Sequence, residues 1–395
     1  MNVLLLGNGF DLYHKLPTTY LSFLTIAEYL AKHNQIPPTY ELFFDEVKNK
    51  CRELDDSFTI YKDLYLSKNV FSNEDFYALE QFQDIIQHNE WANYFLSMYN
   101  SDLSWIDFEK EINKVIIEFK RINTDFKFVQ RIGEIRGKNN SKIFKQFKKY
   151  FTVVEKHLVL NFKFTKESTV IDNLLEVDMN KIFENLYLSL LSFEDAFKIY
   201  LNYFIEKPLL NSKTEFIERN SVFNKFNKVI TFNYTNTFEK LYNGEVYHIH
   251  GNIDKQIVMG INPTKDDELD ELDTSTIMFK KYYQRILFRT DNEFFNEFGK
   301  ETVPSHGIDN LIVSGHSLDV TDQDIIKTIF KKSKNTYILF HSQSALSNYI
   351  KNLISIYGKK EFDIFRAESN LKFITYDALP DINLTNDLGT KAFVY

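Results

Sequence analysis

Hydrophobic positions recur with different periods in the middle of the chain and in its later part. Between 105–122 and again between 182–201, apolar residues return about every 3.6 positions, which predicts long amphipathic helices. From about 225 onwards, short runs of β-branched and aromatic residues alternate with amphipathic stretches, which predicts strands separated by helices. The predicted strands are 2–6, 229–232, 246–249, 256–259, 311–313, 337–340 and 373–376, and clear helices are predicted at 324–331 and 346–357.

The order of these elements predicts an α/β fold. Strands that alternate with helices form parallel βαβ units, so we expect a doubly wound, mostly parallel sheet that is Rossmann-like, with a large all-helical insertion. Residues 1–35 and 225–395 would together form a nucleotide-binding α/β domain. Residues 36–224 would form the helical insertion domain.

Composition narrows the class of protein. The 395 residues include 47 Lys+Arg and 55 Asp+Glu, and a net charge of −8 argues against nucleic acid as the default partner. With one cysteine, Cys51, the chain cannot form an internal disulfide or a zinc site built on cysteines. The start of the chain lacks the basic region of a signal peptide, and no apolar stretch is as long as a bilayer span. We therefore expect a cytoplasmic protein with no membrane partner.

One part of the predicted helical insertion is strongly basic. Residues 110–166 contain 15 Lys+Arg against 5 acidic residues, with aromatic residues between them. Such a pattern can bind single-stranded nucleic acid, but it is also typical of an amphipathic helix pair with a solvated basic face. We favour the second interpretation and keep a nucleic-acid effector as an alternative.

Candidate chemistry lies where the predicted strands end. Glycine and polar residues follow four of the strands, at 7–11, 233–237, 250–252 and 314–319. In an open parallel sheet the carboxyl ends of the strands meet at one edge, and ligands bind in the crevice there. We therefore expect these distant segments to converge on one site.

Each of these segments also has a purely structural interpretation. Gly7 and Gly9 could cradle a phosphate, or they could form a tight turn from strand to helix, since the third glycine of the dinucleotide fingerprint is missing. Asn233 could bind a ribose hydroxyl or a water, or close its strand as an Asx-turn. His250 is the candidate base because Gly251 beside it would let a ligand approach, although a lone histidine is often part of a core.

Other polar residues are expected to have local roles. Asp319 and Asp322 would serve the start of the helix that follows them, and Asp107 and Glu109 would favour the start of another. The segment 315–319 is no nucleophile elbow, because Asp319 occupies the position that needs glycine. Four histidines without ligand spacing, at 14, 306, 316 and 341, lead us to expect no metal.

Taken together, these motifs resemble the AbiH family of phage abortive-infection proteins. The resemblance rests on residues 7–12 with 16–20, on 105–109, on 231–237, on 248–251 and on 315–319, and it spans positions 3 to about 330 in the order of the family. It implies a role in defence against bacteriophage.

The same order of motifs is also similar to sirtuin-like domains, which bind NAD. This second resemblance implies that NAD is the substrate and that His250 and Asn233 are catalytic. It further implies that cofactor-binding residues come from the glycine loop and from the ends of later strands, namely Gly7, Asn8, Gly9, Phe10, Asp11, Thr231, Gly251, Gly315 and Ser317.

The departures from the sirtuin pattern change the expected reaction. Thr235 replaces an acidic residue, Asp11 stands where sirtuins have serine, and the zinc-binding cysteines have no counterpart. Deacylation of a peptide is thus disfavoured, and we expect hydrolysis of NAD to nicotinamide and ADP-ribose. The alternatives are a nucleotide-binding regulatory module without turnover and the nucleic-acid effector. A homo-oligomer or a second defence subunit would assemble through the helical region.

Overall fold

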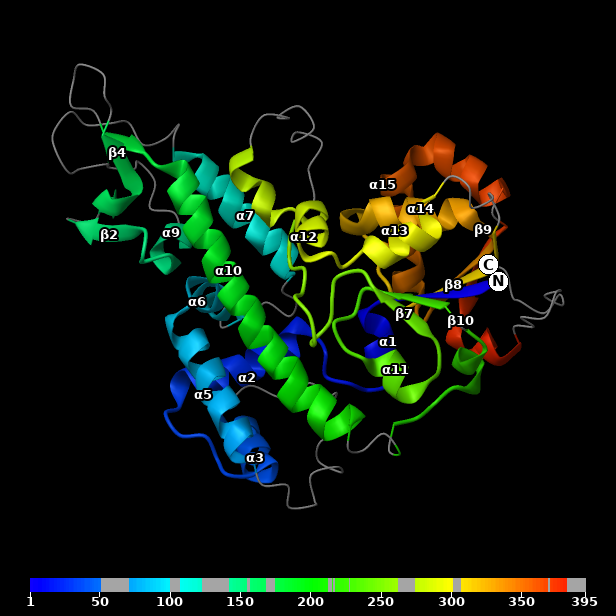
Figure 1. Cartoon of the computed structure of the whole chain (residues 1–395), viewed down its shortest axis with the longest axis horizontal. Coiled ribbons are helices and arrows are strands. Elements are labelled where there is room, and N and C mark those ends of the chain that lie inside the picture. The colour runs from blue at the N-terminus through cyan, green and yellow to red at the C-terminus, as the bar shows by residue number, and fades with distance from the viewer. Residues whose placement is uncertain are drawn as a thin grey trace.

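The computed structural model contains a parallel sheet with helices against it and a helical part to one side (Figure 1). It describes residues 1–50, 71–99, 107–122, 142–154, 157–167, 175–211, 215, 217–226, 228–261, 274–300, 307–368 and 370–381. Cys51, Trp105 and His306 lie outside the described residues.

The sheet has six strands in the order β10-β9-β8-β1-β6-β7, and all its pairs are parallel. The strands are β1 (Asn2–Leu6), β6 (Lys228–Thr231), β7 (Glu245–His248), β8 (Ile308–Ser314), β9 (Ser333–Phe340) and β10 (Leu371–Thr375). The chain adds β6 and β7 on one side of β1, then returns to place β8, β9 and β10 on the other. The prediction of an α/β fold with a mostly parallel sheet is thus confirmed.

The two faces of the sheet are buried against different helices. Alternate residues of a strand point to opposite faces, so Leu4 and Leu6 of β1 join one apolar cluster while Val3 and Leu5 join another. The second cluster is closed by α13 (Asn292–Phe298), α14 (Gln323–Lys332) and α15 (Gln343–Glu368). The first cluster is continuous with the core of the helical part, so sheet and helices share one hydrophobic core.

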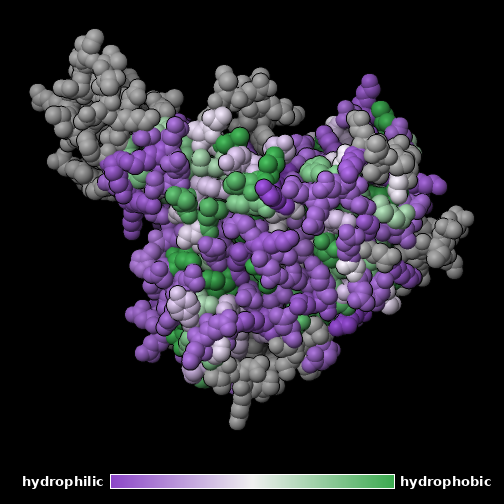
Figure 2. Space-filling view, in the orientation of Figure 1, coloured by the Kyte–Doolittle hydropathy of each residue, from purple (hydrophilic) through white to green (hydrophobic). Residues whose placement is uncertain are grey.

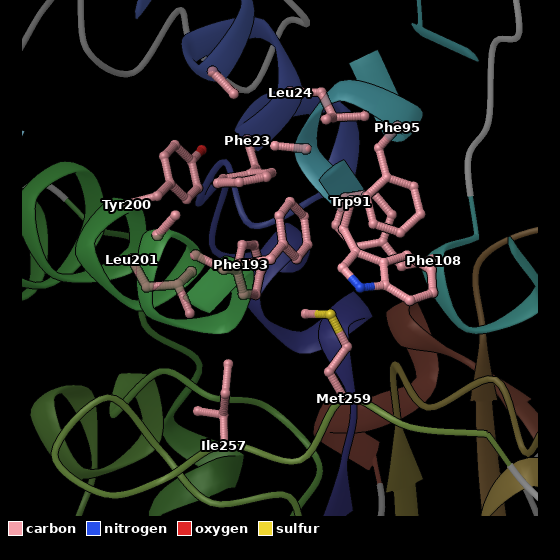
Figure 3. Close-up of a cluster of buried hydrophobic side chains, with 14 of the residues drawn as sticks. Phe23, Leu24, Trp91, Phe95, Phe108, Phe193, Tyr200, Leu201, Ile257 and Met259 are labelled. Atoms are coloured by element: carbon pink, nitrogen blue, oxygen red, sulfur yellow. The ribbon is translucent and has the colours of Figure 1, made fainter. Parts of the chain in front are cut away.

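The helical part is built around aromatic rings. Its helices are α2 (Tyr20–Lys32), α3 (Tyr40–Lys50), α5 (Asn73–His88), α6 (Glu90–Tyr99), α7 (Phe108–Lys120), α9 (Lys142–Gln146) and α10 (Met179–Leu201), and α10 continues into a π-helix, η3 (Asn202–Leu210). In Figure 3, Phe23, Phe95, Phe108 and Phe193 come from different helices and lie together in the core. Phe95 stacks on Phe108 with ring centroids 4.2 Å apart, and Phe193 lies 5.1 Å from Phe95.

Two predictions for secondary structure were wrong. The insertion is not all-helical, because it also holds two short antiparallel pairs, β2 (Phe151–Val154) with β3 (His157–Leu160) and β4 (Thr165–Glu167) with β5 (Leu175–Val177). Residues 257–259 of the run at 256–259 are buried, but the run is not a strand. Its apolar side chains enter the core, whereas its backbone pairs with a loop, through Val258 N donating to His250 O at 2.9 Å.

The described part of the basic stretch has the features of a solvated face. Phe144, Phe147 and Tyr150 are buried around Phe119, with ring centroids 5.2 to 5.6 Å from it. The lysines at 142, 145, 148 and 149 are exposed beside them. Rings that pack a core cannot stack on bases, which weakens the nucleic-acid alternative. Phe126 and Phe128 lie outside the described residues.

One helix has its polarity reversed. In α12 (Lys281–Phe288) the polar side chains of Lys281, Gln284 and Arg285 are buried, while those of Tyr282 and Ile286 are more than half exposed. Hydrophilic residues cover most of the face seen in Figure 2, and hydrophobic residues reach it only in patches. Burying a lysine and an arginine requires acidic partners inside the protein, and these define the site described below.

Within the described ranges, no helix combines the length and the apolar character needed to cross a bilayer.

We predict that Gly315→Ala destabilises the fold much more than Gly358→Ala. Both glycines have φ near +70°, but a Cβ at 315 would lie 2.2 Å from Phe10 N, whereas no atom of the described residues lies within 4 Å of one at 358. We expect a loss of about 3 kcal/mol for Gly315→Ala and about 1 kcal/mol for Gly358→Ala in urea denaturation. Equal losses would contradict the proposed packing.

Candidate active site

The glycine turn after β1 interlocks with the turn after β8. Gly7 N donates to Ser314 O at 3.2 Å, and Gly9 N donates to Gly315 O at 2.9 Å. A Cβ on Gly7 would lie 2.5 Å from the Cα of His316, and one on Gly9 would lie 2.6 Å from the Cα of Gly315. The glycines therefore let two strand ends touch through their backbones, and two of the loop amides already have acceptors within the chain.

The remaining residues of this loop point in different directions. Phe10 is buried among rings, and its amide donates to Gly7 O at 2.8 Å in the short helix α1 (Asn8–Tyr13). Asn8 is exposed, and its Oδ1 accepts from Thr18 at 2.7 Å. Of these residues, the side chain of Asn8 is the one best placed to meet a ligand from solvent.

Asp11 is a buried carboxyl with one oxygen to spare. Its Oδ2 accepts from Thr235 Oγ1 at 2.7 Å, while its Oδ1 has no hydrogen-bond partner in the described chain. Burial raises the pKa of Asp11 to about 6, against the lowering effect of the hydrogen bond from Thr235 and of the nearby polar side chains of Thr237 and Asn233. Asp11 thus joins the glycine loop to the segment that follows β6.

The segment after β6, residues 233–237, is held from several sides. Asn233 N donates to Thr231 Oγ1 at 3.1 Å, and His248 Nδ1 donates to Asn233 O at the same distance. Asn236 N donates to Glu206 of the π-helix at 2.6 Å. Asn233 and Thr231 are both buried, so the predicted ribose-binding asparagine sits in a rigid, nearly enclosed position.

His250 forms a buried pair with an aspartate. Its Nε2 lies 2.9 Å from Asp322 Oδ1, and both side chains are nearly inaccessible to solvent, with 5% and 7% exposed. In the described part of the chain no residue hydrogen-bonds Nδ1, so the Nε2–H tautomer leaves a lone pair there. Burial lowers the pKa of His250 to about 4, helped by the positive charge of Lys281 and opposed by Asp322. The imidazole is therefore neutral at physiological pH.

Asp322 also receives Lys281 and faces a second histidine. Lys281 Nζ, from α12, donates to Asp322 Oδ1 at 3.3 Å and to Glu109 Oε1 of α7 at 2.8 Å. His316 Nε2 lies 3.6 Å from Asp322 Oδ2, and Leu318 N donates to the other nitrogen of His316 at 2.9 Å. His316 therefore carries its proton on Nε2, toward the carboxylate.

The charges of this cluster shape one another. Burial opposes the ionisation of Asp322, but Lys281 and His250 outweigh it and keep the pKa of Asp322 well below its ordinary value. For Lys281, the carboxylates of Asp322 and Glu109 outweigh burial and raise its pKa. Burial raises the pKa of Glu109 to about 7, with Lys281 opposing the rise. The buried ammonium of Lys281 thus lies between the carboxylate of Asp322 and the carboxyl group of Glu109.

Other predicted residues have packing roles or stay at the rim. Gly251, with φ +72°, lies where a Cβ would meet Gln256 O at 2.0 Å, so the turn itself needs glycine there. Ser317 is exposed, and its carbonyl accepts from Asn352. Phe232 stands between the two histidines, with ring centroids 5.1 Å from His250 and 4.1 Å from His316. The segments after β7 and β8 are thus brought together by contacts that His316 and Asp322 make.

Sequence reasoning missed the most important charged partners. Asp319 does begin its helical turn, because it accepts from Thr321 N at 3.0 Å, but the side chain of Asp322 makes no such bond and pairs with His250 instead. Glu109 lies in the first turn of α7, yet its carboxylate meets Lys281. The signal available was the polarity of 281–288, where lysine and arginine occupy the face that a normal helix fills with apolar residues.

One further histidine from the sequence analysis, His14, can be placed. His14 is a core residue, bonded to Phe10 O and to the hydroxyl of Tyr242 at 2.8 Å each. In the parts of the chain that the structure describes, no group of three or more His, Cys, Asp or Glu side chains could hold a metal ion.

Comparison with known protein families finds a match that covers most of the chain. The family model described as bacteriophage abortive infection AbiH matches residues 3–342. No curated protein matches the chain, and no solved structure does.

We predict that Asp322→Asn lowers stability strongly, whereas Asp319→Asn changes it little. The first substitution removes the buried charge that Lys281 and His250 share, which should cost about 3 kcal/mol. The second keeps a side chain that caps equally well, so the expected change is within about 0.5 kcal/mol. Urea denaturation at pH 7.5 measures both, and a mild effect of Asp322→Asn would count against a charged aspartate.

Proposed function

Because this chain belongs to the AbiH family of bacteriophage abortive-infection proteins, we propose that it serves phage defence by hydrolysing NAD at the site around His250. Family membership over residues 3–342 indicates the defence role. The reaction is our inference from the chemistry at the strand ends, and its products would be nicotinamide and ADP-ribose. Loss of NAD would halt the metabolism of an infected cell before the phage matures.

The observation that carries this proposal is the state of His250. Asp322 accepts a hydrogen bond from the Nε2–H of His250, so that Nδ1 is left with a lone pair on a neutral ring. A water could give its proton to Nδ1, directly or through a ribose hydroxyl that relays it, while the water oxygen bonds to the anomeric carbon and nicotinamide leaves with the electron pair of the glycosidic bond. Asp322 would stabilise the imidazolium that forms, as a carboxylate does for histidine in hydrolases.

The strand order supports a nucleotide as the substrate. Numbered along the chain, the six sheet strands lie in the order 6-5-4-1-2-3, which is the order of doubly wound dinucleotide-binding folds. Ligands of such folds bind at the carboxyl edge where the order reverses, here between β1 and β8. The glycine turn, Gly315 and His316 all lie at that reversal.

In this proposal the other residues have distinct roles. Gly7, Gly9, Phe10 and Gly315 shape the floor, and Asn8 and Ser317 reach the ligand from the exposed rim. Asn233 would orient the ribose or the attacking water, with Thr231 and His248 fixing its backbone. Asp11 has a spare oxygen and a pKa near 6, and this oxygen would accept a hydrogen bond from a hydroxyl of the ribose.

The burial of His250 favours a second candidate function. At 4% exposed, the residue would meet substrate only after the surrounding loops shift. The resting protein could therefore bind a nucleotide at the rim as a regulatory signal without turning it over. Binding of NAD without release of nicotinamide, both with and without phage components, would favour this alternative.

We predict that His250→Ala lowers NAD hydrolysis by at least about 100-fold, since a positioned base contributes that much or more. Nicotinamide release by purified protein, followed by chromatography, measures the loss. His88→Ala is the matched control. His88 is an exposed histidine of α5, outside the segments that follow the strands, so this variant should keep wild-type activity. Undiminished turnover by a folded His250→Ala protein would remove His250 from the mechanism.

We predict that the acid limb of kcat/KM has its midpoint near pH 4. The neutral form of His250 is the active one, and its pKa is lowered from 6.5 to about 4, so activity should stay level from pH 8 down to about 5 and fall below that. Initial rates across this range, on protein whose folding is checked at each pH, test the sign and the position. A midpoint between 6 and 7 would mean that another group, Asp11 or a different histidine, controls the activity in place of His250.

A further inference from the structure

Lys281 is an unusual residue for its position. It begins α12 and is 1% exposed, although a lysine in the first turn of a helix is unfavourable next to the positive end of the helix dipole. The reversed polarity of α12 turns it inward, and there it lies between two carboxylates, Glu109 at 2.8 Å and Asp322 at 3.3 Å. Packing alone does not explain a buried ammonium, since an apolar side chain would fill the same space at lower cost.

The partner on the far side of Lys281 comes from another part of the chain. Glu109 lies in the first turn of α7, and the aromatic ring of Phe108 in the same turn packs in the helical core. Asp322 immediately precedes α14, a helix that packs against the sheet. The ammonium therefore bridges the helical part to the sheet edge. Thr321 adds a weaker contact, with its Oγ1 3.4 Å from Lys281 Nζ.

The contact between Lys281 and Asp322 bears directly on His250. Lys281 Nζ and His250 Nε2 share the same oxygen, Asp322 Oδ1, while His316 faces the other oxygen. A carboxylate fixed at both oxygens has one orientation, and that orientation selects the Nε2–H tautomer of His250. The proton would otherwise be free to exchange between the two ring nitrogens.

We propose that Lys281, anchored by Glu109 of the helical part, is a positioning residue that fixes Asp322 and thereby keeps the Nδ1 lone pair of His250 available. The catalytic importance of Lys281 rests on the proposed function. Its effect on the orientation of Asp322 and on the tautomer of His250 does not. It makes the helical part a component of the site, because the anchor of the ammonium lies on α7.

The groups that face His250 define what the substitutions change. They are Asp322 before α14, Lys281 and Arg285 of α12 and Tyr234 after β6, while His316 after β8 lies 3.6 Å from the other oxygen of Asp322. Arg285 is held by Asp291 at 3.1 Å and by Asp324, away from Asp322. Among these cations, Lys281 is the one that touches the carboxylate of the histidine pair.

The test follows the His250 ring by NMR on full-length protein with isotope-labelled histidine, with the resonance assigned through His250→Asn. In the wild type we expect one tautomer, protonated on Nε2, with the ring neutral down to about pH 5. Lys281→Met should raise the titration midpoint by about one pH unit or more, because a repelling charge is lost while Asp322 stays. Lys281→Arg should restore the wild-type midpoint.

A second variant covers the case in which Lys281→Met does not fold. Glu109→Gln leaves the ammonium buried but loosens its anchor, and we expect the Nδ1–H tautomer to appear in the nitrogen spectrum. Lys228→Met and Glu297→Gln are matched controls, since this pair, 2.7 Å apart, lies at the start of β6 and so at the opposite edge of the sheet. Both controls should leave the His250 spectrum unchanged.

Nicotinamide release by the same samples separates the two proposals. Folded Lys281→Met and Glu109→Gln proteins with a wild-type His250 spectrum would overturn the positioning role, whatever their turnover. If Lys281→Met is unfolded, an unchanged tautomer in Glu109→Gln is by itself enough to overturn the positioning role. A changed spectrum in a protein that never releases nicotinamide would overturn only NAD hydrolysis. With both proposals correct, kcat should fall about 10-fold or more while KM changes little.

Discussion

The ionised carboxylate of Asp322 is the interaction on which the arrangement of the site depends. It is buried, so it persists only because Lys281 and two histidine N–H groups compensate for lost hydration. Each of these partners comes from a different segment: α12, the turn after β7 and the turn after β8. One charge therefore sets the relative positions of several loops, whereas the neutral state of His250 follows from its burial and from the positive charge of Lys281.

Close contact between backbones fixes the ends of β1 and β8 relative to each other. Gly7 and Gly9 let the end of β1 lie against the end of β8, and two amides that a phosphate could have used donate to carbonyls of the chain. The loop thus serves first as a joint between neighbouring strands. Side chains at its rim, such as Asn8, are left to contact whatever the site binds.

The elements of the fold could be predicted from the sequence further than the contacts of the site. Runs such as 229–232 and 337–340 are apolar because they are buried on both faces, and that pattern needs no knowledge of neighbours. The convergence of strand ends also follows from parallel topology. The pairing of Asp322 with His250 does not, because an aspartate before a helix looks like a cap, and only the turns after β7 and β8 bring a histidine to it. The run at 256–259 misled for the same reason, since burial alone does not make a strand.

The central position of β1 has a consequence for the order in which the protein folds. The strand occupies residues 2–6, yet its partners begin at Lys228 and Ile308. During synthesis the first apolar segment leaves the ribosome more than two hundred residues before it can pair. Leu4 and Leu6 share a cluster with the helices that follow, so those helices can shelter the segment while it waits. The sheet would thus be completed around β1, the sheet strand that is synthesised first. Until then, the helices made after β1 would cover its apolar side chains.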